Sequence, residues 1–341
     1  ANRFQVGPDS AGADPGPACY RRGGPLTVTD CNVLLGRIQP AHFPSVFGAE
    51  GNQPLDGEVV RLGFAKLARE IGTKTGRKTT PEAVAEGFLR IAVENMANAI
   101  KTISVQRGYD VTDYTLQCFG GAGGQHCCRV ADALGMTRIF LHPLAGVLSA
   151  YGMGLADIRS LREAQIEHPL AASDLAEVLD RVVQPLLAAV RGEVRGQGVA
   201  EDQIRTFVRV HLRYGGTDSS LEVDLGDAVA MRRSFEAAHK QRFGFIAPER
   251  PLVVEAQVVE GVGRTEPPDE PELPQTTTIL QPEQQVALQV EGAWRQVPLY
   301  LRSRLQPGQM LDGPALIIEP IGTVVLEPGW RARCNSRHHL V

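Results

Sequence analysis

One glycine-rich segment, residues 114–138, constrains this 341-residue chain more than any other. A strand-like run ends at Phe119, residues 120–124 read Gly-Gly-Ala-Gly-Gly, and a helical pattern follows before a second strand at 137–142. Glycines at such a turn let backbone N–H groups approach a ligand, and the start of the following helix favours an anion. The segment therefore predicts a strand, turn, helix and strand in order, with a phosphate or nucleotide contact at the turn.

Composition excludes several classes of protein. The formal net charge is −4 and no basic tract reverses it, so we expect no nucleic-acid partner. No apolar run reaches membrane-spanning length, so we expect no membrane partner either. The six cysteines are scattered and form no C-x-x-C pair, a pattern typical of reduced thiols in a cytoplasmic protein rather than of a zinc site.

The chain begins with Ala1 and enters a Gly/Pro-rich segment at residues 7–25 almost at once. We therefore expect part of a longer polypeptide, in which any site found here is half a site. The Gly and Pro density excludes a regular helix at 7–25. The segment lacks the Ser, Glu and Lys bias of a flexible tether, which favours an ordered loop over a linker.

A short helix is expected at residues 31–38, with Thr29 or Asp30 as its cap. Asp30 thus has two open interpretations, a helix cap or a polar group that faces a cleft. Longer helices are expected at 79–108, at 174–196 and at 231–243, because apolar residues recur there at helical spacing.

Strand patterns dominate the rest of the chain. Residues 208–214 alternate apolar and polar side chains, and a Gly-Gly turn leads to 220–225 as a hairpin. An apolar strand follows at 252–259. The Pro- and Glu-rich run after it is the clearest linker, and five short strand-like runs lie beyond, at 285–290, 295–301, 315–319, 323–326 and 331–334. We therefore divide the chain into residues 1–265, a linker at 266–276, and a small β-rich domain at 277–341.

Taken together and in order, these segments resemble the hydantoinase A/5-oxoprolinase family. The matching motifs extend over nearly the whole chain and lie at residues 6–20, 26–30 with 35–37, 118–126, 146–152, 212–218, 239–245 and 313–319. Gly-Gly-Gln-His at 123–126 and Phe-Gly-Phe at 243–245 favour the 5-oxoprolinase branch over the N-methylhydantoinase and acetone-carboxylase branches.

The resemblance implies an α/β fold that is part of an actin-like ATPase, related to sugar kinases and Hsp70, followed by the small all-β domain. It also implies an enzyme that couples hydrolysis of ATP to opening of the lactam of 5-oxo-L-proline, with L-glutamate as product. Phosphorylation of the lactam oxygen would turn a poor electrophile into an activated imidate. Charge on the transferred group would need Mg²⁺ and oriented donors.

By the same resemblance the nucleotide-binding residues are Gly120, Gly121, Ala122, Gly123 and Gly124, and a helix from about residue 125 would face the cleft. Tight packing of the turn is the alternative. Asp30 and His126 are the candidate catalytic residues, although a histidine at this place is also explained by a hydrogen bond near a helix start. A Cys19 nucleophile is a weaker alternative, because no base is identifiable beside it. His338 and His339 are expected to be solvated, and the metal ligands stay unknown.

Two parts of the family pattern are not visible here: an amino-terminal lobe with acidic and glycine-rich phosphate loops, and a hydantoinase B-type partner, either a separate subunit or a fused domain. We therefore expect a carboxy-terminal portion of the A-type unit that binds ATP weakly or not at all and does not turn over alone. Two other functions stay open. One is an ATP-using subunit of the N-methylhydantoinase or acetone-carboxylase type, and the other is a non-catalytic assembly module for the B-type partner.

Overall fold

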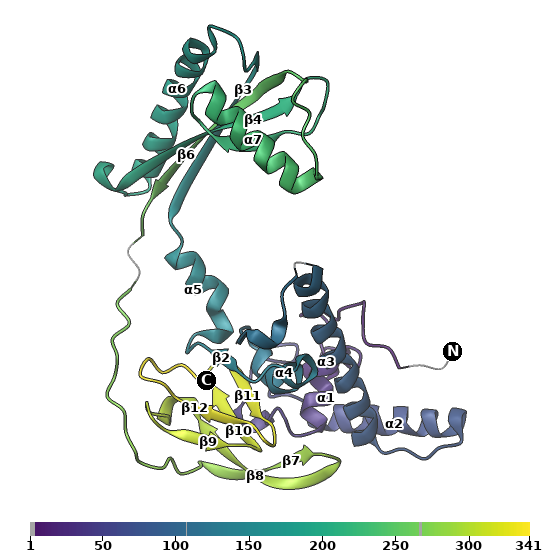
Figure 1. The fold of residues 1–341 in the computed structure, drawn as a ribbon. Helices are drawn as coiled ribbons and strands as arrows, with labels where there is room; N and C mark the ends of the chain where they lie inside the picture. The colour runs from purple at the N-terminus through teal and green to yellow at the C-terminus, as the bar shows by residue number, and fades with distance from the viewer. Residues whose placement is uncertain (1–3, 107, 266–267) are drawn as a thin grey trace. The chain divides into compact units, whose positions relative to one another are not determined.

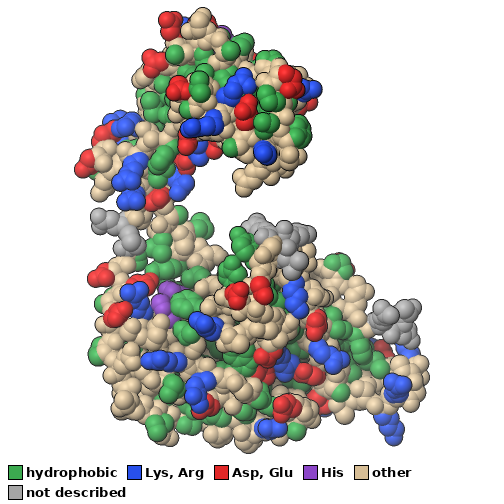
Figure 2. All heavy atoms as spheres, in the orientation of Figure 1, with side chains coloured by type: hydrophobic (Ala, Val, Ile, Leu, Met, Phe, Trp, Pro, Cys, Tyr) green, Lys and Arg blue, Asp and Glu red, His purple; other side chains and the backbone are tan. Residues whose placement is uncertain are grey.

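The computed structural model describes residues 4–106, 108–265 and 268–341 (Figure 1). The chain packs into two compact units. Unit 1 comprises Ala1–Tyr151 and Glu270–Val341, and unit 2 comprises Gly152–Asp269. In the visible face of each unit, Lys and Arg side chains are interspersed with Asp and Glu rather than gathered in one basic patch (Figure 2). No helix among the described residues is long and apolar enough to cross a membrane.

Three helices form the amino-terminal layer of unit 1: α1 (Val28–Leu34), α2 (Gly57–Thr75) and α3 (Pro81–Gln106). The predicted helix at 79–108 is confirmed as α3, although residue 107 of that prediction lies outside the described part. The side chain of Asp56 accepts hydrogen bonds from two backbone N–H groups and so caps α2. The three helices bury a common apolar core, which includes Cys31, Val60, Phe64, Val84 and Leu89.

The glycine-rich segment folds as predicted into strand, turn, helix and strand. β1 (Leu116–Cys118) pairs in parallel with β2 (Ile139–Leu141), and α4 (Cys127–Leu134) connects them. A 3-10 turn at Gly123–Gln125 comes before α4, so the α-helix begins two residues after the expected position. Both strands are only three residues long.

The predicted carboxy-terminal strands are confirmed. β7 (Gln284–Val290), β8 (Ala293–Leu301), β10 (Ala315–Glu319) and β11 (Gly322–Leu326) form one sheet in the order β11-β10-β8-β7. A second, two-stranded sheet pairs β9 (Met310–Asp312) with β12 (Arg331–Arg333).

These strands pack with the glycine-rich segment. One buried cluster joins residues of α4, β1 and β2 to residues of β10, β11 and β12, among them Cys128, Val130, Ile317, Val324 and Ala332. The packing therefore groups residues 277–341 with the first half of the chain. The domain boundaries expected from the sequence stay a prediction, and the first two residues of the expected linker, 266 and 267, lie outside the described part.

Unit 2 is an antiparallel sheet with two helices. Its strands lie in the order β3-β6-β4-β5, formed by β3 (Ile158–Pro169), β4 (Ile204–Tyr214), β5 (Leu221–Asp224) and β6 (Leu252–Gly263). The predicted hairpin is confirmed, since β4 pairs antiparallel with β5.

The two helices of unit 2 match the predicted ones. α6 (Leu175–Gly196) packs on β3 and β6, and α7 (Ala228–Phe243) packs on β5. Glycine is required where α6 meets the sheet, because a Cβ at Gly261 would lie 3.0 Å from the side chain of Val190. One further helix, α5 (Leu148–Leu155), lies at the boundary between the units.

Candidate functional site

The glycine turn has an inner edge that packs against the carboxy-terminal sheet. A Cβ at Gly124 would lie 2.8 Å from the backbone oxygen of Thr323 in β11, and one at Gly123 would lie 3.0 Å from the Sγ of Cys118. Gly121 is itself exposed and borders both edges of the turn, since a Cβ there would lie 3.0 Å from the backbone oxygen of Ile321. Tight packing therefore accounts for the absence of side chains at these three positions.

The outer edge of the turn is open. Gly120, Gly121 and Ala122 are exposed, and nothing lies within 4 Å of a Cβ placed on Gly120. Gly120 adopts a φ of +88°, and its N–H donates to the backbone oxygen of Ala145 at 2.8 Å. Because this conformation favours glycine, Gly120 holds the turn in a shape that leaves the edge at 120–122 accessible to a ligand.

Asp30 is fully buried and accepts four hydrogen bonds. Its carboxylate oxygens accept from the backbone N–H and hydroxyl of Thr27 at 2.7 and 3.0 Å, and from the backbone N–H groups of Ala18 and Cys19 at 3.1 and 2.8 Å. Thr27 is the N-cap of α1 and Asp30 is its third residue, in a capping box. The expectation that Thr29 or Asp30 is the N-cap is therefore wrong, because the helix begins earlier, at Val28, and its N-cap is Thr27.

The surroundings of Cys19 oppose a role as nucleophile. Burial raises the pKa of its thiol, and the neighbouring Asp30 carboxylate raises it further. The thiol is therefore protonated at neutral pH, whereas a cysteine nucleophile must be a thiolate.

His126 is buried just before α4 and is bonded on one side only. Its Nε2 lies 3.5 Å from the amide nitrogen of Asn32, which donates a second, shorter hydrogen bond of 2.9 Å to the side-chain oxygen of Gln125. The Nδ1 of His126 has no hydrogen-bond partner among the described residues. Since the Asn32 amide is a donor, Nε2 accepts and the proton of the neutral ring sits on Nδ1.

Burial lowers the pKa of His126 to about 4, and the nearby cations Arg37 and Arg129 contribute in the same direction. The ring is therefore neutral at pH 7 and offers one free N–H donor. Asp30 and His126 are both tied to α1, because Asp30 lies in that helix and Asn32 contacts His126. In the described part of the chain no hydrogen bond joins Asp30 directly to His126.

A buried network of charges lies beside His126. The Glu327 carboxylate accepts from Arg37 at 2.6 Å and from Arg129 at 2.6 Å, and Arg129 also donates to Glu86 at 2.7 Å. Arg37, which is 1% exposed, also donates to the backbone oxygen of Gln125. The network joins α3 and α4, through Glu86 and Arg129, to Glu327, the residue after β11. Through Arg37 it also fixes the backbone at Gln125, immediately before His126.

The charges within this network stabilise one another. Burial alone would raise the pKa of Glu327, but Arg37 and Arg129 hold it below its usual range. Sequence reasoning missed the network. Arg37 lies within a recognised motif, but nothing local indicates that its partner is 290 residues away.

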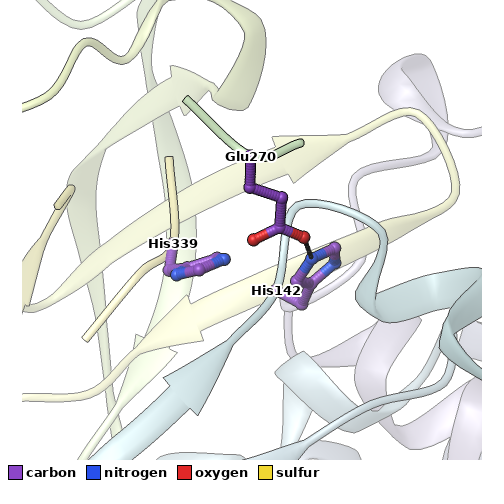
Figure 3. A group of neighbouring side chains, drawn as sticks. All are labelled: His142, Glu270 and His339. Carbon is purple, nitrogen blue, oxygen red and sulfur yellow. Dashed lines mark ion pairs between the residues drawn. The ribbon is translucent and has the colours of Figure 1, made fainter. Parts of the chain in front are cut away.

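A second polar cluster includes His142, the residue directly after β2. His142, Glu270 and His339 have ligand atoms that all lie within 4.8 Å of one another (Figure 3). His339 is 8% exposed, so the expectation that it is solvated is wrong. Its ring packs on Phe140 with the centroids 4.7 Å apart, which explains the burial.

The protein class follows from comparison with known sequences and structures. Residues 1–162 match the hydantoinase/oxoprolinase family model, and residues 170–341 match the hydantoinase/oxoprolinase C-terminal domain model. The chain belongs to the hydantoinase/oxoprolinase family. It is 37% identical to the 5-oxoprolinase PfmaA of Pestalotiopsis fici over 98% of this chain and 26% of that protein. It is 30% identical to caprolactamase subunit alpha of Pseudomonas jessenii, over 96% of this chain and 48% of that protein.

A solved structure supports the fold. The nucleotide-free structure of acetone carboxylase matches 99% of this chain with a TM-score of 0.80 at 21% identity, and the match covers 49% of the acetone carboxylase chain. The expected fold, part of an actin-like ATPase with a carboxy-terminal β region, is confirmed. The chain spans about a quarter of the 5-oxoprolinase and about half of the caprolactamase subunit.

Proposed function

We propose that this chain is part of an ATP-dependent hydrolase of cyclic amides, with 5-oxo-L-proline as the substrate. The reaction would consume 5-oxo-L-proline, ATP and water, and would yield L-glutamate, ADP and phosphate. The observation that carries the proposal is the 37% identity to a 5-oxoprolinase, which extends over 98% of this chain rather than over one motif.

The exposed edge formed by Gly120, Gly121 and Ala122 is the proposed contact with ATP, and the packed residues Gly123 and Gly124 would hold that edge in place. When bound, ATP would supply the phosphoryl group that activates the lactam oxygen for attack by water. The N–H of Gly120 is already donated to Ala145, so the N–H groups of Gly121 and Ala122 would be the donors; backbone N–H groups on a glycine turn suit a phosphate, which supports this assignment. Mg²⁺ belongs to the proposal through the chemistry of phosphoryl transfer, and the ligands for it stay unknown.

Asp30 and His126 would contribute in different ways. Asp30 uses both carboxylate oxygens to hold Thr27, Ala18 and Cys19, so it would act by positioning the loop before α1. His126 is neutral and keeps one free N–H, so it would donate a hydrogen bond. A neutral ring with so low a pKa would not serve as a cationic general acid at pH 7.

Partner subunits belong to the proposal as well. One similar protein is named a subunit alpha, which supports assembly with a hydantoinase B-type subunit or a fused equivalent. The rest of the nucleotide site would come from an amino-terminal ATPase lobe, since this chain spans only part of its relatives. An assembly module without catalysis is the alternative that this observation also favours.

The test uses the full-length protein with its partner. ATP hydrolysis is measured with 5-oxo-L-proline, caprolactam, hydantoin, or acetone plus bicarbonate, and glutamate release is measured in parallel. We expect ATP hydrolysis that depends on 5-oxo-L-proline, with one glutamate formed for each ADP. Stimulation by acetone and bicarbonate alone would assign the carboxylase reaction instead. This 341-residue chain by itself is expected to give no coupled turnover.

If Gly121 and His126 variants leave the activity of the complex unchanged, the chain is an assembly module and the catalytic proposal fails. Ordinary coupled turnover by the isolated chain would overturn the split-site proposal.

A further inference from the structure

The chain leaves unit 1 after Tyr151 and enters it again at Glu270, and these two residues are in contact. The hydroxyl of Tyr151 donates to Oε1 of Glu270 at 2.9 Å. Two positions that are 119 residues apart in sequence are thus joined where the chain passes between the units.

Two histidines complete the surroundings of the Glu270 carboxylate (Figure 3). The Nε2 of His142 lies 3.6 Å from Oε1 of Glu270, and the His142 ring stacks on Tyr151 with the centroids 5.0 Å apart. The ring of His339 also packs against His142, with the centroids 5.1 Å apart. The carboxylate is therefore hydrogen-bonded to Tyr151 and paired with His142, while the ligand atom of His339 lies within 4.8 Å of it.

A metal site is the obvious alternative for two histidines and a carboxylate, and the hydrogen bonds oppose it. The backbone N–H of Leu144 donates to Nδ1 of His142 at 3.0 Å. The amide nitrogen of Asn335 lies 3.3 Å from Nδ1 of His339, and the Asn335 oxygen accepts from the backbone N–H groups of Arg337 and His339, which fixes the orientation of the amide.

Since both Nδ1 atoms accept, each neutral ring carries its proton on Nε2. A histidine that binds a metal through Nε2 needs the reverse arrangement, a lone pair on Nε2 and a proton on Nδ1 that is donated to an acceptor. Each neutral ring therefore carries an Nε2–H donor, and that of His142 lies next to the Glu270 carboxylate. The Tyr151 hydroxyl first, and then His142, hold the pKa of Glu270 below its usual range, so the carboxylate is ionised at neutral pH.

The segment after Glu270 is also fixed to unit 1. The backbone N–H of Leu273 donates to the oxygen of Ser336 at 2.8 Å, and that of Thr276 donates to the oxygen of Pro307 at 2.8 Å. We call residues 270–276 the strap. Most of the segment expected to be a linker is therefore attached along its length, with Glu270 as the first attachment.

We propose that Tyr151 and His142, with the His339 ring packed beside His142, form a carboxylate clamp that holds Glu270 and locks the strap onto unit 1. With the clamp closed, the two connections to unit 2 start from one fixed point. With the clamp open, Glu270 is no longer attached, and the segment that returns from unit 2 is first held to unit 1 at Leu273. The clamp is thus a conformational device that sets the length of the connection between the units.

Hydrogen exchange of the full-length protein tests the clamp, with the backbone N–H groups of Leu273 and Thr276 as reporters. Tyr151→Phe removes one hydroxyl and Glu270→Ala removes the carboxylate. Each is expected to speed exchange at Leu273 about tenfold or more, because a hydrogen bond to a charged group is lost. Glu272→Gln is the control, since Glu272 lies two residues away, is well exposed and, among the described residues, is paired only with Arg337 at 3.5 Å. In the Glu272→Gln variant, hydrogen exchange at Leu273 and Thr276 should be as slow as in the unaltered protein.

Unchanged exchange at Leu273 in both clamp variants would overturn the proposal. A folding defect is recognised separately, because it would also speed exchange in β10 and β11. Titration with Zn²⁺, Mn²⁺ or Ni²⁺ provides the second measurement. Stoichiometric micromolar binding that is lost in both His142→Ala and His339→Ala would show a metal site and would equally overturn the clamp.

Discussion

Arg37 and Glu327 lie 290 residues apart in the sequence and form a buried ion pair with 2.6 Å between Nη1 and Oε1. The Arg37 side chain is 1% exposed and the Glu327 side chain is 10% exposed. The pair connects the end of α1 with the end of β11, and Arg37 also donates to the backbone oxygen of Gln125, immediately before His126. The position of the candidate site therefore depends on a contact between the two ends of unit 1.

Removing the charge of Glu327 should strongly destabilise unit 1. In Glu327→Gln, Arg37 stays buried without its counter-charge, which typically costs about 3–5 kcal/mol in the free energy of unfolding. Urea unfolding followed by tryptophan fluorescence measures the loss, since Trp294 and Trp330 both lie in unit 1. Glu58→Gln is the control, because its pair with Arg61 is exposed on α2. Equal midpoints for the two variants would show that the buried pair contributes nothing.

The low pKa of His126 should make unit 1 less stable in mild acid. The unfolded chain binds a proton near pH 6.5, whereas the folded ring binds one only near pH 4, so stability is present above pH 6.5 and falls as the pH drops below it. Between pH 7.5 and pH 5 the loss from this one group is about 2 kcal/mol. In His126→Gln, the free energy of unfolding of unit 1 should therefore fall less steeply as the pH is lowered across this range. The control is His211→Gln in unit 2, which should leave the pH dependence of the unfolding free energy of unit 1 unchanged.

The elements with strong local patterns could be predicted from the sequence, and the others could not. α3 and α6 carry long apolar stripes, and the glycine turn is marked by its composition. α2 was missed because its buried positions, Val60, Phe64 and Ala68, are separated by charged residues. β3 could not be predicted because it is an edge strand in which Ser160 is the one buried residue, so no apolar alternation marks it.

The candidate site shows the same limit. Asp30 could be assigned to the start of a helix, since capping depends on neighbours three residues away. Its contacts with Ala18 and Cys19, and the pairing of Arg37 with Glu327, depend on which distant segments meet. The same holds for the expected linker, because nothing in its Pro- and Glu-rich composition indicates that Glu270 has a binding partner in Tyr151.

Two glycines should respond oppositely to alanine. In Gly124→Ala the new Cβ would meet the backbone of Thr323 at 2.8 Å and the side chain of Val324 at 3.0 Å, so β11 must shift. Overpacking of this kind costs about 1–3 kcal/mol. Gly87 lies inside α3 with nothing within 4 Å of a Cβ, so Gly87→Ala should be neutral or stabilising by up to about 1 kcal/mol. Thermal unfolding compares the two, and a Gly124→Ala protein as stable as Gly87→Ala would contradict the packing described for the inner edge.

The outer edge of the turn can be tested without disturbing the packing. Ala122 is exposed and has helical backbone angles, φ −97° and ψ −12°, so it accepts a larger side chain. In the full-length protein, Ala122→Glu would place a negative charge beside the proposed phosphate contact. At an effective dielectric constant of about 20, like charges about 6 Å apart repel by about 3 kcal/mol. Even with half of that screened, the KM for ATP should rise about tenfold.

Ala122→Gln provides the matched comparison, since it has the same shape without the charge. We expect its KM for ATP to stay within about twofold of the unaltered protein, and the melting temperatures of both variants to stay unchanged because the side chain is exposed. Equal KM values for the Glu and Gln variants would place the phosphates away from this turn. A rise confined to Ala122→Glu, and reduced at high salt, would assign the exposed edge to the nucleotide.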